Sequence, residues 1–331
     1  MRCAVIGAGA WGTALANVLT ENEHDVVLWA RESDVVESVN GRQANDRFLA
    51  GHALDARLRA TGDMCEAVAD AELVVYVPPS HALRAVAAAG RHAVAADATV
   101  VVASKGIERG TLALMTEVVA EELPGRAVVA LSGPSFAAEV ADRQPTAIVA
   151  ASESRGAATV AQEAFSNSVL RVYTTEDIVG VELGGSLKNV MAVATGIAEG
   201  LGLGFNSRAA LITRGLAEMS RLGVALGASP RTFAGLAGLG DLVLTCTGSL
   251  SRNRALGFDI GKGATLDQAL EGRETVAEGV VSAASALALA EREGVEMPIV
   301  AAVNRTLFEG YPAQRAIEDL MGRELRPEND R

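Results

Sequence analysis

A glycine-rich turn near the N-terminus constrains the fold more than any other feature of this 331-residue sequence. Residues 7–12 read GAGAWG, which matches the pattern G-x-G-x-x-G. An apolar run at residues 4–7 leads into the turn, a helical stretch at residues 11–22 follows it, and a second apolar run occupies residues 26–29. A strand, a tight turn, a helix and a second strand within about thirty residues form the βαβ unit that this pattern requires. We therefore expect a Rossmann-type fold to begin here.

The three glycines of this turn have separate roles. Gly7 permits the tight turn, Gly9 lets the backbone approach a pyrophosphate, and Gly12 lets helix and strand pack closely. The pyrophosphate then lies at a helix N-terminus, where free N–H groups and the helix dipole favour an anion. The turn predicts a dinucleotide site. A glycine-rich turn that serves another ligand is the less favoured alternative.

The choice between NAD and NADP is expected at the end of the second strand. An Asp or Glu there binds the ribose 2′-OH of NAD, whereas an arginine accommodates the 2′-phosphate of NADP. Arg31 falls near this position and Glu32 follows it. We expect NADP to be accepted, while Glu32 leaves NAD open as the cofactor. The alternative interpretation of Arg31 is a solvated charge at the start of a helix.

The chain changes character near residue 177. Before it, β-rich runs alternate with helical stretches, which predicts an α/β domain with a doubly wound, mainly parallel sheet. After it, apolar residues recur every three or four positions, which predicts helices. We expect a Rossmann domain at residues 1–177, an all-helical domain at 178–322 and a polar, frayed tail at 323–331. The further strands are expected at residues 73–77, 99–103, 127–131, 147–151 and 169–173, the helices of the first domain at 82–89 and 111–122, and those of the second at 177–200, 207–222, 241–244, 252–261, 265–271, 276–293 and 313–321.

The composition disfavours several classes of protein. Hydrophobic residues make up 49% of the chain and charged residues 21%, which is typical of a globular enzyme. The net charge of −12 disfavours nucleic acid and anionic membranes as partners. Three scattered cysteines form neither a disulfide framework nor a metal-binding spacing. With no targeting peptide and no uncharged apolar run of about 18 residues, we expect a cytoplasmic protein without a membrane span or a metal.

Three polar segments point to chemistry. Lys105 directly follows an apolar strand, at the sheet edge where open α/β sheets bind ligands, although a surface lysine is as good an interpretation. Lys188 is flanked by apolar and small residues, which lowers an amine's pKa from about 10.4 and suits it to proton transfer, unless its stem merely spans a helix face. Asp241 alone reads as a helix N-cap. Arg252 and Asn253, after Ser251, indicate an anion site at a helix start.

Taken together, these segments resemble NAD(P)-dependent glycerol-3-phosphate dehydrogenases. The matching segments come in that family's order and span about residues 5–280, so the set is far more specific than any member. They are GAGAWG at 7–12, VPPS at 77–80, SKG at 104–106, LSGPSFA at 131–137, LKNV at 187–190, GDL at 240–242 and RNR at 252–254. The second proline of VPPS departs from the single proline expected there, and this loop change puts little in doubt. The resemblance implies a Rossmann domain, a helical domain and an active site in the cleft between them.

The resemblance also implies roles for individual residues. Lys188 is the proton donor and acceptor, and Lys105 and Asp241 complete the catalytic group. The residues implied around the substrate are Lys105, Gly133, Ser135, Lys188, Asn189, Asp241, Thr245, Ser251, Arg252 and Asn253. The residues implied at the cofactor are Gly7, Gly9, Ala10, Trp11, Gly12, Arg31, Lys105, Ala137, Arg252, Val276 and Glu278.

The activity implied is the reversible reduction of dihydroxyacetone phosphate by NAD(P)H to sn-glycerol 3-phosphate. This reaction feeds glycerophospholipid synthesis, and the resemblance implies that the enzyme is a cytoplasmic homodimer. Arg252 and Asn253 would bind the substrate phosphate. One alternative is a β-hydroxyacid dehydrogenase of similar layout with a carboxylate substrate, which the segments at Asp241 and Arg252 disfavour. A non-catalytic NADP-binding sensor is another, but it would not need Lys188, Asp241 and Arg252 together.

Overall fold

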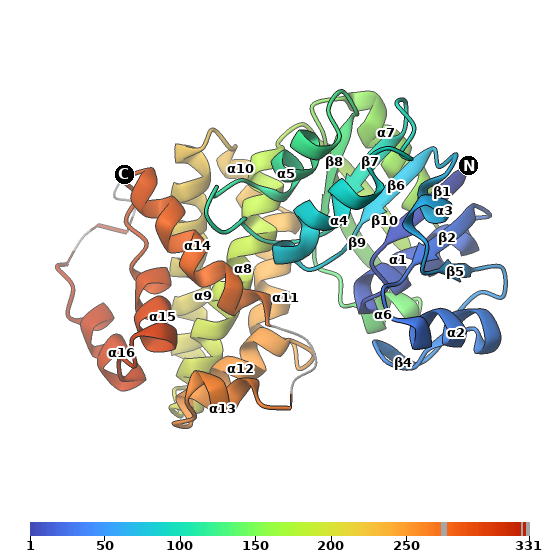
Figure 1. The fold of residues 1–331 in the computed structure, drawn as a ribbon. Helices are drawn as coiled ribbons and strands as arrows, with labels where there is room; N and C mark the ends of the chain where they lie inside the picture. The colour runs from blue at the N-terminus through green and yellow to red at the C-terminus, as the bar shows by residue number, and fades with distance from the viewer. Residues whose placement is uncertain (273–276, 326, 329–331) are drawn as a thin grey trace.

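The chain folds into an eight-stranded sheet flanked by helices, followed by a domain of helices alone (Figure 1). The computed structural model describes residues 1–272, 277–325 and 327–328. The strands of the large sheet are β1 (Arg2–Ile6), β2 (Asp25–Trp29), β5 (Arg59–Thr61), β6 (Leu73–Tyr76), β7 (Thr99–Val102), β8 (Val128–Ser132), β9 (Thr146–Ala151) and β10 (Leu170–Thr175).

The strand order is that of a doubly wound sheet. It runs β10-β9-β8-β7-β6-β1-β2-β5, and every neighbouring pair is parallel except β8 with β9. The chain reverses its direction of winding between β1 and β6, and ligands of such sheets bind beyond the carboxyl ends of the strands at this point. The expected Rossmann-type sheet is confirmed. The antiparallel β8–β9 pair was not predicted, and neither was the three-residue strand β5.

Helices cover both faces of the sheet, as the two-sided burial of its strands requires. In β1, Cys3 and Val5 face a core that includes Leu15 of the first helix, whereas Ala4 and Ile6 face a second core on the opposite side. This alternation follows from the two-residue repeat of a strand. The helices of this domain are α1 (Ala10–Glu21), α2 (Ser33–Arg42), α3 (Met64–Val68), the short η1 (Ser80–Ala82), α4 (Leu83–Gly90), α5 (Met115–Glu122), α6 (Ala137–Ala141) and α7 (Arg155–Phe165), and a small second sheet pairs β3 (Ala44–Asn45) with β4 (Leu49–Ala53).

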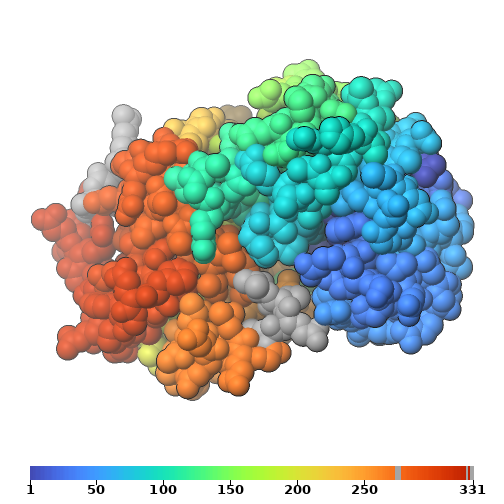
Figure 2. Space-filling view, in the orientation of Figure 1, coloured from blue at the N-terminus to red at the C-terminus, as the bar shows by residue number. Residues whose placement is uncertain are grey.

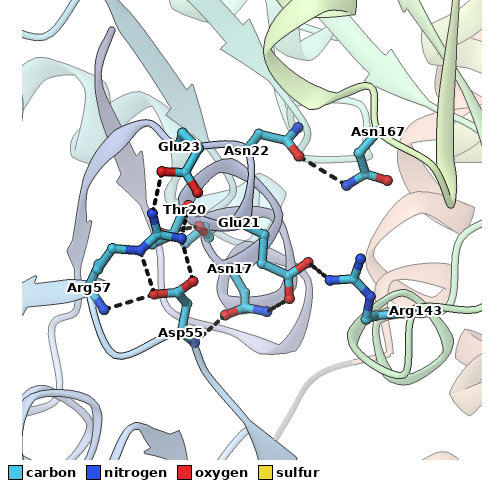
Figure 3. A network of polar contacts seen from close by, with 10 residues as sticks. Asn17, Thr20, Glu21, Asn22, Glu23, Asp55, Arg57, Arg143 and Asn167 are labelled. Carbon is cyan, nitrogen blue, oxygen red and sulfur yellow. Dashed lines mark hydrogen bonds and ion pairs between the residues drawn. The ribbon is translucent and has the colours of Figure 1, made fainter.

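A polar network fastens the far end of α1 to the segment of Asp55 and Arg57, to Arg143, which donates to Glu21, and to Asn167 (Figure 3). Arg57 donates to Asp55 and Glu23, and the backbone N–H of Asp55 donates to Asn17 at 2.7 Å. Asn167, in the connection after α7, donates to Asn22 at 3.1 Å. Charged and carboxamide groups here use their hydrogen-bonding capacity within the protein, which fixes α1 and therefore the glycine turn at its other end.

The second domain is built around one long central helix, α8, which is buried along nearly its whole length. A helix that is apolar or small on all sides can be enclosed by other helices. Figure 1 shows α8 in the midst of the bundle, and Figure 2 shows the surfaces of the two domains meeting along one boundary. The helices of this domain are α8 (Ile178–Gly200), α9 (Phe205–Ala225), α10 (Pro230–Phe233), the short η2 (Leu236–Gly240), α11 (Asp241–Thr247), α12 (Arg252–Gly261), α13 (Leu266–Leu270), α14 (Glu278–Arg292), α15 (Pro298–Phe308) and α16 (Ala313–Met321).

Helices α8 and α12 cross with their backbones in direct contact. A Cβ atom added to Gly196 would lie 2.1 Å from the carbonyl oxygen of Arg254, and one added to Gly257 would lie 2.2 Å from that of Val193. Real Cβ atoms do not approach backbone so closely, so only glycine allows this crossing. It fixes the start of α12 relative to the residues of α8.

Several predicted helix limits differ from the structure. Helix α5 begins at Met115 rather than at residue 111, and α9 extends beyond the predicted 207–222 at both ends. Helix α14 begins at Glu278, after the extended N-cap residue Ala277, and ends at Arg292, whereas 276–293 was predicted. Helix α15 was missed, although Pro298 occupies its first turn, where proline is favoured.

Within the described residues no single helix has the length and apolar composition to cross a membrane, although the bent pair Pro230–Thr247 and Arg252–Gly261 meets those two criteria together.

Candidate active site

The glycine turn at the start of α1 is shaped to receive an anion. Gly7 has a φ of +117°, which L side chains rarely adopt, and a Cβ on Gly12 would lie 1.9 Å from the carbonyl oxygen of Gly7. By contrast, a Cβ on Gly9 would meet nothing within 4 Å. Gly9 is also the N-cap of α1, and no side chain caps the helix there. The free N–H groups of α1 therefore face open space, as a dinucleotide pyrophosphate requires.

The end of β2 lies beside this turn. The backbone N–H of Gly7 donates to the carbonyl oxygen of Trp29 at 3.1 Å. Two residues farther on, Arg31 is exposed over 82% of its side chain and pairs with Glu32 at 2.7 Å. An exposed guanidinium held by one carboxylate retains donors for a phosphate. Ala10 is the first residue of α1, and Trp11 follows it, half-buried.

Three charged side chains from distant parts of the chain meet at the domain junction. Lys105 comes from the loop after β7, Lys188 from α8 and Asp241 from the start of α11. Nζ of Lys105 donates to Oδ2 of Asp241 at 2.8 Å, and Nζ of Lys188 donates to Oδ1 of the same carboxylate. The reading of Asp241 as a helix N-cap is wrong, because Gly240 holds that position and makes no side-chain cap.

Burial sets the protonation of this group. Burial, together with the charge of Lys105, lowers the pKa of the Lys188 amine to about 7, against the attraction of Asp241. Burial by itself would raise the pKa of Asp241, but the two lysines outweigh it and hold that pKa below its usual value. The hydroxyl of Thr245 lies 3.4 Å from Oδ1 of Asp241 and also bonds its backbone oxygen. The result is a carboxylate flanked by an amine that can exchange a proton near neutral pH.

Two residues that the sequence analysis did not assign to the site shape the surroundings of Lys105. A Cβ on Gly185 would lie 2.7 Å from Oγ of Ser132 and 3.3 Å from Cδ of Lys105. Oγ of Ser132 is buried and has no hydrogen-bond partner among the described residues. The pair Gly184 and Gly185 within α8 could have indicated this contact from the sequence, because glycine inside a helix costs stability and usually marks a close packing contact.

The predicted anion-binding segment joins α12 to α8 and α14. Ser251 is the N-cap of α12 and accepts from the N–H of Arg254 at 3.3 Å. Asn253 donates to Oδ1 of Asn189 at 3.0 Å, and its own Oδ1 accepts from the N–H of Gly279 at 2.9 Å. Arg252, between them, is exposed. The structure thus joins Asn253, which lies two residues after Ser251, to Asn189, the residue that follows Lys188 in α8.

The remaining predicted site residues lie at the carboxyl ends of β8 and β6 or against them. Gly133 has a φ of +138° and accepts a hydrogen bond from Ser135 at 3.0 Å, and Ala137 opens α6. Glu278 accepts from the hydroxyl of Ser80 at 2.8 Å. Val276 lies outside the described residues.

Comparison with known proteins matches this arrangement over most of the chain. Residues 2–158 match the model of the NAD-dependent glycerol-3-phosphate dehydrogenase N-terminus, and residues 177–318 match that of its C-terminus. A glycerol-3-phosphate dehydrogenase [NAD(P)+] of Trichlorobacter lovleyi is 53% identical over 332 residues, which cover 99% of each chain. One of Geobacter sp. (strain M21) is 51% identical over 330 residues, covering 99% of this chain and 98% of the relative.

The chain belongs to the NAD-dependent glycerol-3-phosphate dehydrogenase family. The family is one of oxidoreductases, and its solved members share the fold. Glycerol-3-phosphate dehydrogenase from Coxiella burnetii superposes with a TM-score of 0.94 at 40% identity, covering 97% of this chain and 99% of that one. A ketopantoate reductase from Ralstonia eutropha, with a TM-score of 0.61 at 15% identity over 97% of this chain and 100% of that one, shares the fold alone.

Proposed function

We propose that this chain catalyses the reversible reduction of dihydroxyacetone phosphate to sn-glycerol 3-phosphate with NAD(P)H, and so supplies glycerophospholipid synthesis. The observation that carries the proposal is the buried Lys105–Asp241–Lys188 group beside the start of α12. Family membership supports the same reaction. A non-catalytic NADP-binding sensor would leave the acid–base group without a purpose, and the similarity to glycerol-3-phosphate dehydrogenases disfavours a β-hydroxyacid dehydrogenase.

The glycine turn and its neighbours would hold the dinucleotide. The cofactor supplies the hydride when it is bound. Gly7 and Gly12 form the tight turn, and Gly9 leaves the pyrophosphate room at the N-terminus of α1, where no side chain caps the helix. The other residues proposed at the cofactor are Ala10, Trp11, Arg31, Lys105, Ala137, Arg252, Val276 and Glu278.

Lys188 moves the proton. In the direction of reduction, Nζ of Lys188 gives a proton to the carbonyl oxygen of the substrate as negative charge develops there. Lys105 contributes a second positive charge at the same oxygen, which stabilises the transition state in a site with little water. Asp241 orients both amines and keeps the pair of like charges together. In the reverse direction the neutral Lys188 accepts the proton of the alcohol.

The phosphate is bound at the start of α12. A protein of net charge −12 repels an anionic substrate at long range, so a local group of donors has to overcome that repulsion. Arg252 and Asn253, at the N-terminus of a ten-residue helix, provide such donors. Binding of this remote group positions the carbonyl for reaction. Gly133, Ser135, Asn189, Thr245 and Ser251 are the remaining residues proposed around the substrate.

The experiment that tests this function follows nicotinamide absorbance with purified protein, dihydroxyacetone phosphate and either NADPH or NADH. We expect oxidation of the cofactor with the phosphorylated ketone and almost none with dihydroxyacetone. Folded protein that binds NADPH but turns over neither substrate would contradict the proposal, and would direct the search to carboxylate substrates.

We further propose that the protein is a cytoplasmic homodimer with domains at residues 1–177 and 178–322. Closed twofold dimers are the commonest soluble oligomers. The helical domain carries large exposed apolar side chains, such as Phe205 at 83% and Leu250 at 51% exposure, which favour association. Light scattering on the purified chain would measure a mass of twice the monomer, and a monomeric mass would contradict the proposal.

A further inference from the structure

The first turn of α14 is tied to the dinucleotide-binding domain by hydrogen bonding between Ser80 and Glu278. Oγ of Ser80, in η1 just after β6, donates to Oε2 of Glu278 at 2.8 Å, and the two residues are 198 positions apart. Ser80 is only 4% exposed, so water competes little for this bond. Because β6 borders the point where the sheet reverses its winding, Ser80 belongs to the edge that receives the cofactor.

The turn that carries Lys105 is packed against the same serine. A Cβ on Gly106 would lie 2.4 Å from Cβ of Ser80, 2.7 Å from its Oγ and 3.9 Å from Oε2 of Glu278. Only glycine therefore leaves the Ser80 hydroxyl free to reach Glu278. The Ser80–Glu278 bond is therefore adjacent to Gly106, the residue that follows Lys105.

The same turn of α14 is tied to the predicted phosphate site on its other side. The N–H of Gly279 donates to Oδ1 of Asn253 at 2.9 Å, and Nδ2 of Asn253 donates to Asn189 at 3.0 Å. A Cβ on Gly279 would lie 2.6 Å from the carbonyl oxygen of Asn189 and 2.9 Å from Oδ1 of Asn253. The contact is too close for any residue but glycine at position 279. A displacement of Asn253 therefore moves the first turn of α14 with it.

We propose that Ser80 is a positioning residue that couples occupation of the phosphate site to binding of the dinucleotide, through Glu278, Gly279 and Asn253. This inference rests on the proposed function, which gives Asn253 to the phosphate and Glu278 to the cofactor. A ligand that holds Asn253 fixes the first turn of α14, and the Ser80–Glu278 bond passes that order to the cofactor's domain. The second ligand then binds a site that is already ordered, and the effect is reciprocal.

The test measures the Kd of NADH by fluorescence with and without saturating sn-glycerol 3-phosphate. NADH and sn-glycerol 3-phosphate are each the reduced member of their redox couple, so they form a complex that cannot react. NADH also has no 2′-phosphate to compete for an anion site. We expect sn-glycerol 3-phosphate to lower the Kd of NADH by roughly tenfold in the unaltered protein, within the usual range of coupling between two sites.

Ser80→Ala should reduce this coupling factor to nearly one and raise the KM for dihydroxyacetone phosphate by roughly fivefold to tenfold, as expected for one lost hydrogen bond. The pH dependence of kcat should not change, because Lys188 is untouched. The matched control is Ser152→Ala, since Ser152 is also buried but its hydroxyl bonds Val128 within the first domain at 2.7 Å. Ser80→Thr retains the hydroxyl and should retain the coupling.

The outcomes separate the inference from the proposed function. Absence of turnover with dihydroxyacetone phosphate would remove the function. Normal turnover without coupling in the unaltered protein, or an unchanged coupling factor in Ser80→Ala, would overturn the inference alone. Equal losses in Ser80→Ala and Ser152→Ala would also overturn it, because a general loss of stability would then account for both.

Discussion

The amine of Lys188 donates to the carboxylate of Asp241 across the contact between α8 and α11, although the two residues are 53 positions apart. Lys105 holds the other oxygen of that carboxylate. With both amines protonated, the buried group carries a net charge of about +1, and loss of one proton leaves it neutral. The protonation of one lysine therefore decides the charge that a substrate meets.

Lys188→Ala should lower kcat by about 10²–10⁴, the usual contribution of a general acid. The Kd of NADPH should change little, because Lys188 is not among the residues proposed at the cofactor. Steady-state turnover and fluorescence titration measure the two quantities. Lys262→Ala is the control, since Lys262 is exposed at the end of α12 and its amine lies over the ring of Phe258. A Lys188→Ala variant with near-normal kcat would remove Lys188 from its role.

The two directions of the reaction should have opposite pH dependence. Because the pKa of Lys188 is lowered to about 7, the amine is protonated below that pH and neutral above it. Reduction needs the protonated amine, so its kcat should fall as pH rises through about 7. Oxidation needs the neutral amine, so its kcat should rise over the same interval. Profiles that change in parallel would contradict the assignment of Lys188.

Arg31→Ser should weaken NADPH relative to NADH. The guanidinium is exposed beside the end of β2, where the adenosine ribose of a dinucleotide lies in this fold. Loss of a charged hydrogen bond to the 2′-phosphate should raise the KM for NADPH by roughly tenfold or more and leave that for NADH nearly constant. Equal effects on both cofactors would show that Arg31 does not read the 2′-phosphate.

Glu182 should make the protein less stable as pH rises. Burial raises the pKa of this carboxyl to about 7, against hydrogen bonds from Thr116, whose N–H lies 2.9 Å from Oε1. The pKa in the folded chain thus exceeds the value of about 4.3 in the unfolded chain. The stabilisation is complete below about pH 4.3 and is lost as pH rises through about 7.

Glu182→Gln stays neutral, and its amide oxygen can still accept from the N–H of Thr116. Its Tm should exceed that of the unaltered protein by about 5 °C at pH 8, and the difference should shrink toward pH 5. Calorimetry at several pH values measures this. Glu163→Gln, on the exposed face of α7, serves as the control for removing a carboxylate. A Tm difference for Glu182→Gln that does not vary with pH would refute the linkage.

Gly196→Ala should destabilise the protein by about 1–3 kcal/mol, because its Cβ would push α12 away from α8. Thermal melting measures the loss, and the KM for dihydroxyacetone phosphate should rise with it. Gly41→Ala is the matched control: Gly41 also lies within a helix, but a Cβ there meets nothing within 4 Å. If both variants melt alike, the α8–α12 contact is not as close as described.

The sequence predicted those parts of the structure that depend on local patterns. The glycine turn, the apolar strands and the helical repeat after residue 177 each determine a conformation nearby in the chain. The three-residue strand β5 is too short to show a repeat. Strand β9 runs antiparallel to β8 because of the path of the chain between them, and local sequence patterns do not encode that path. Helix α15, which Pro298 opens, was not predicted.

The candidate site divides in the same way. Lys105, Lys188 and Asp241 could be named from their segments, and the low pKa of Lys188 was expected from its apolar neighbours. Their shared carboxylate, however, depends on tertiary structure. So does Ser80, which was noted only as part of a loop and acquires a partner 198 residues away. Contacts of this kind leave no periodic trace in the sequence.

The contact of α8 with α12 has a consequence for the range of substrates. Lys188 lies on one of these helices and Arg252 on the other, and glycines hold the two main chains against each other at Gly196 and Gly257. The distance between the residue proposed to move the proton and the residue proposed to hold the phosphate is therefore set by backbone contact between the two helices. Substitution of side chains around the site can alter affinity, but it cannot increase the distance between Lys188 and Arg252. A homologous substrate one carbon longer would therefore require a different crossing of α8 and α12.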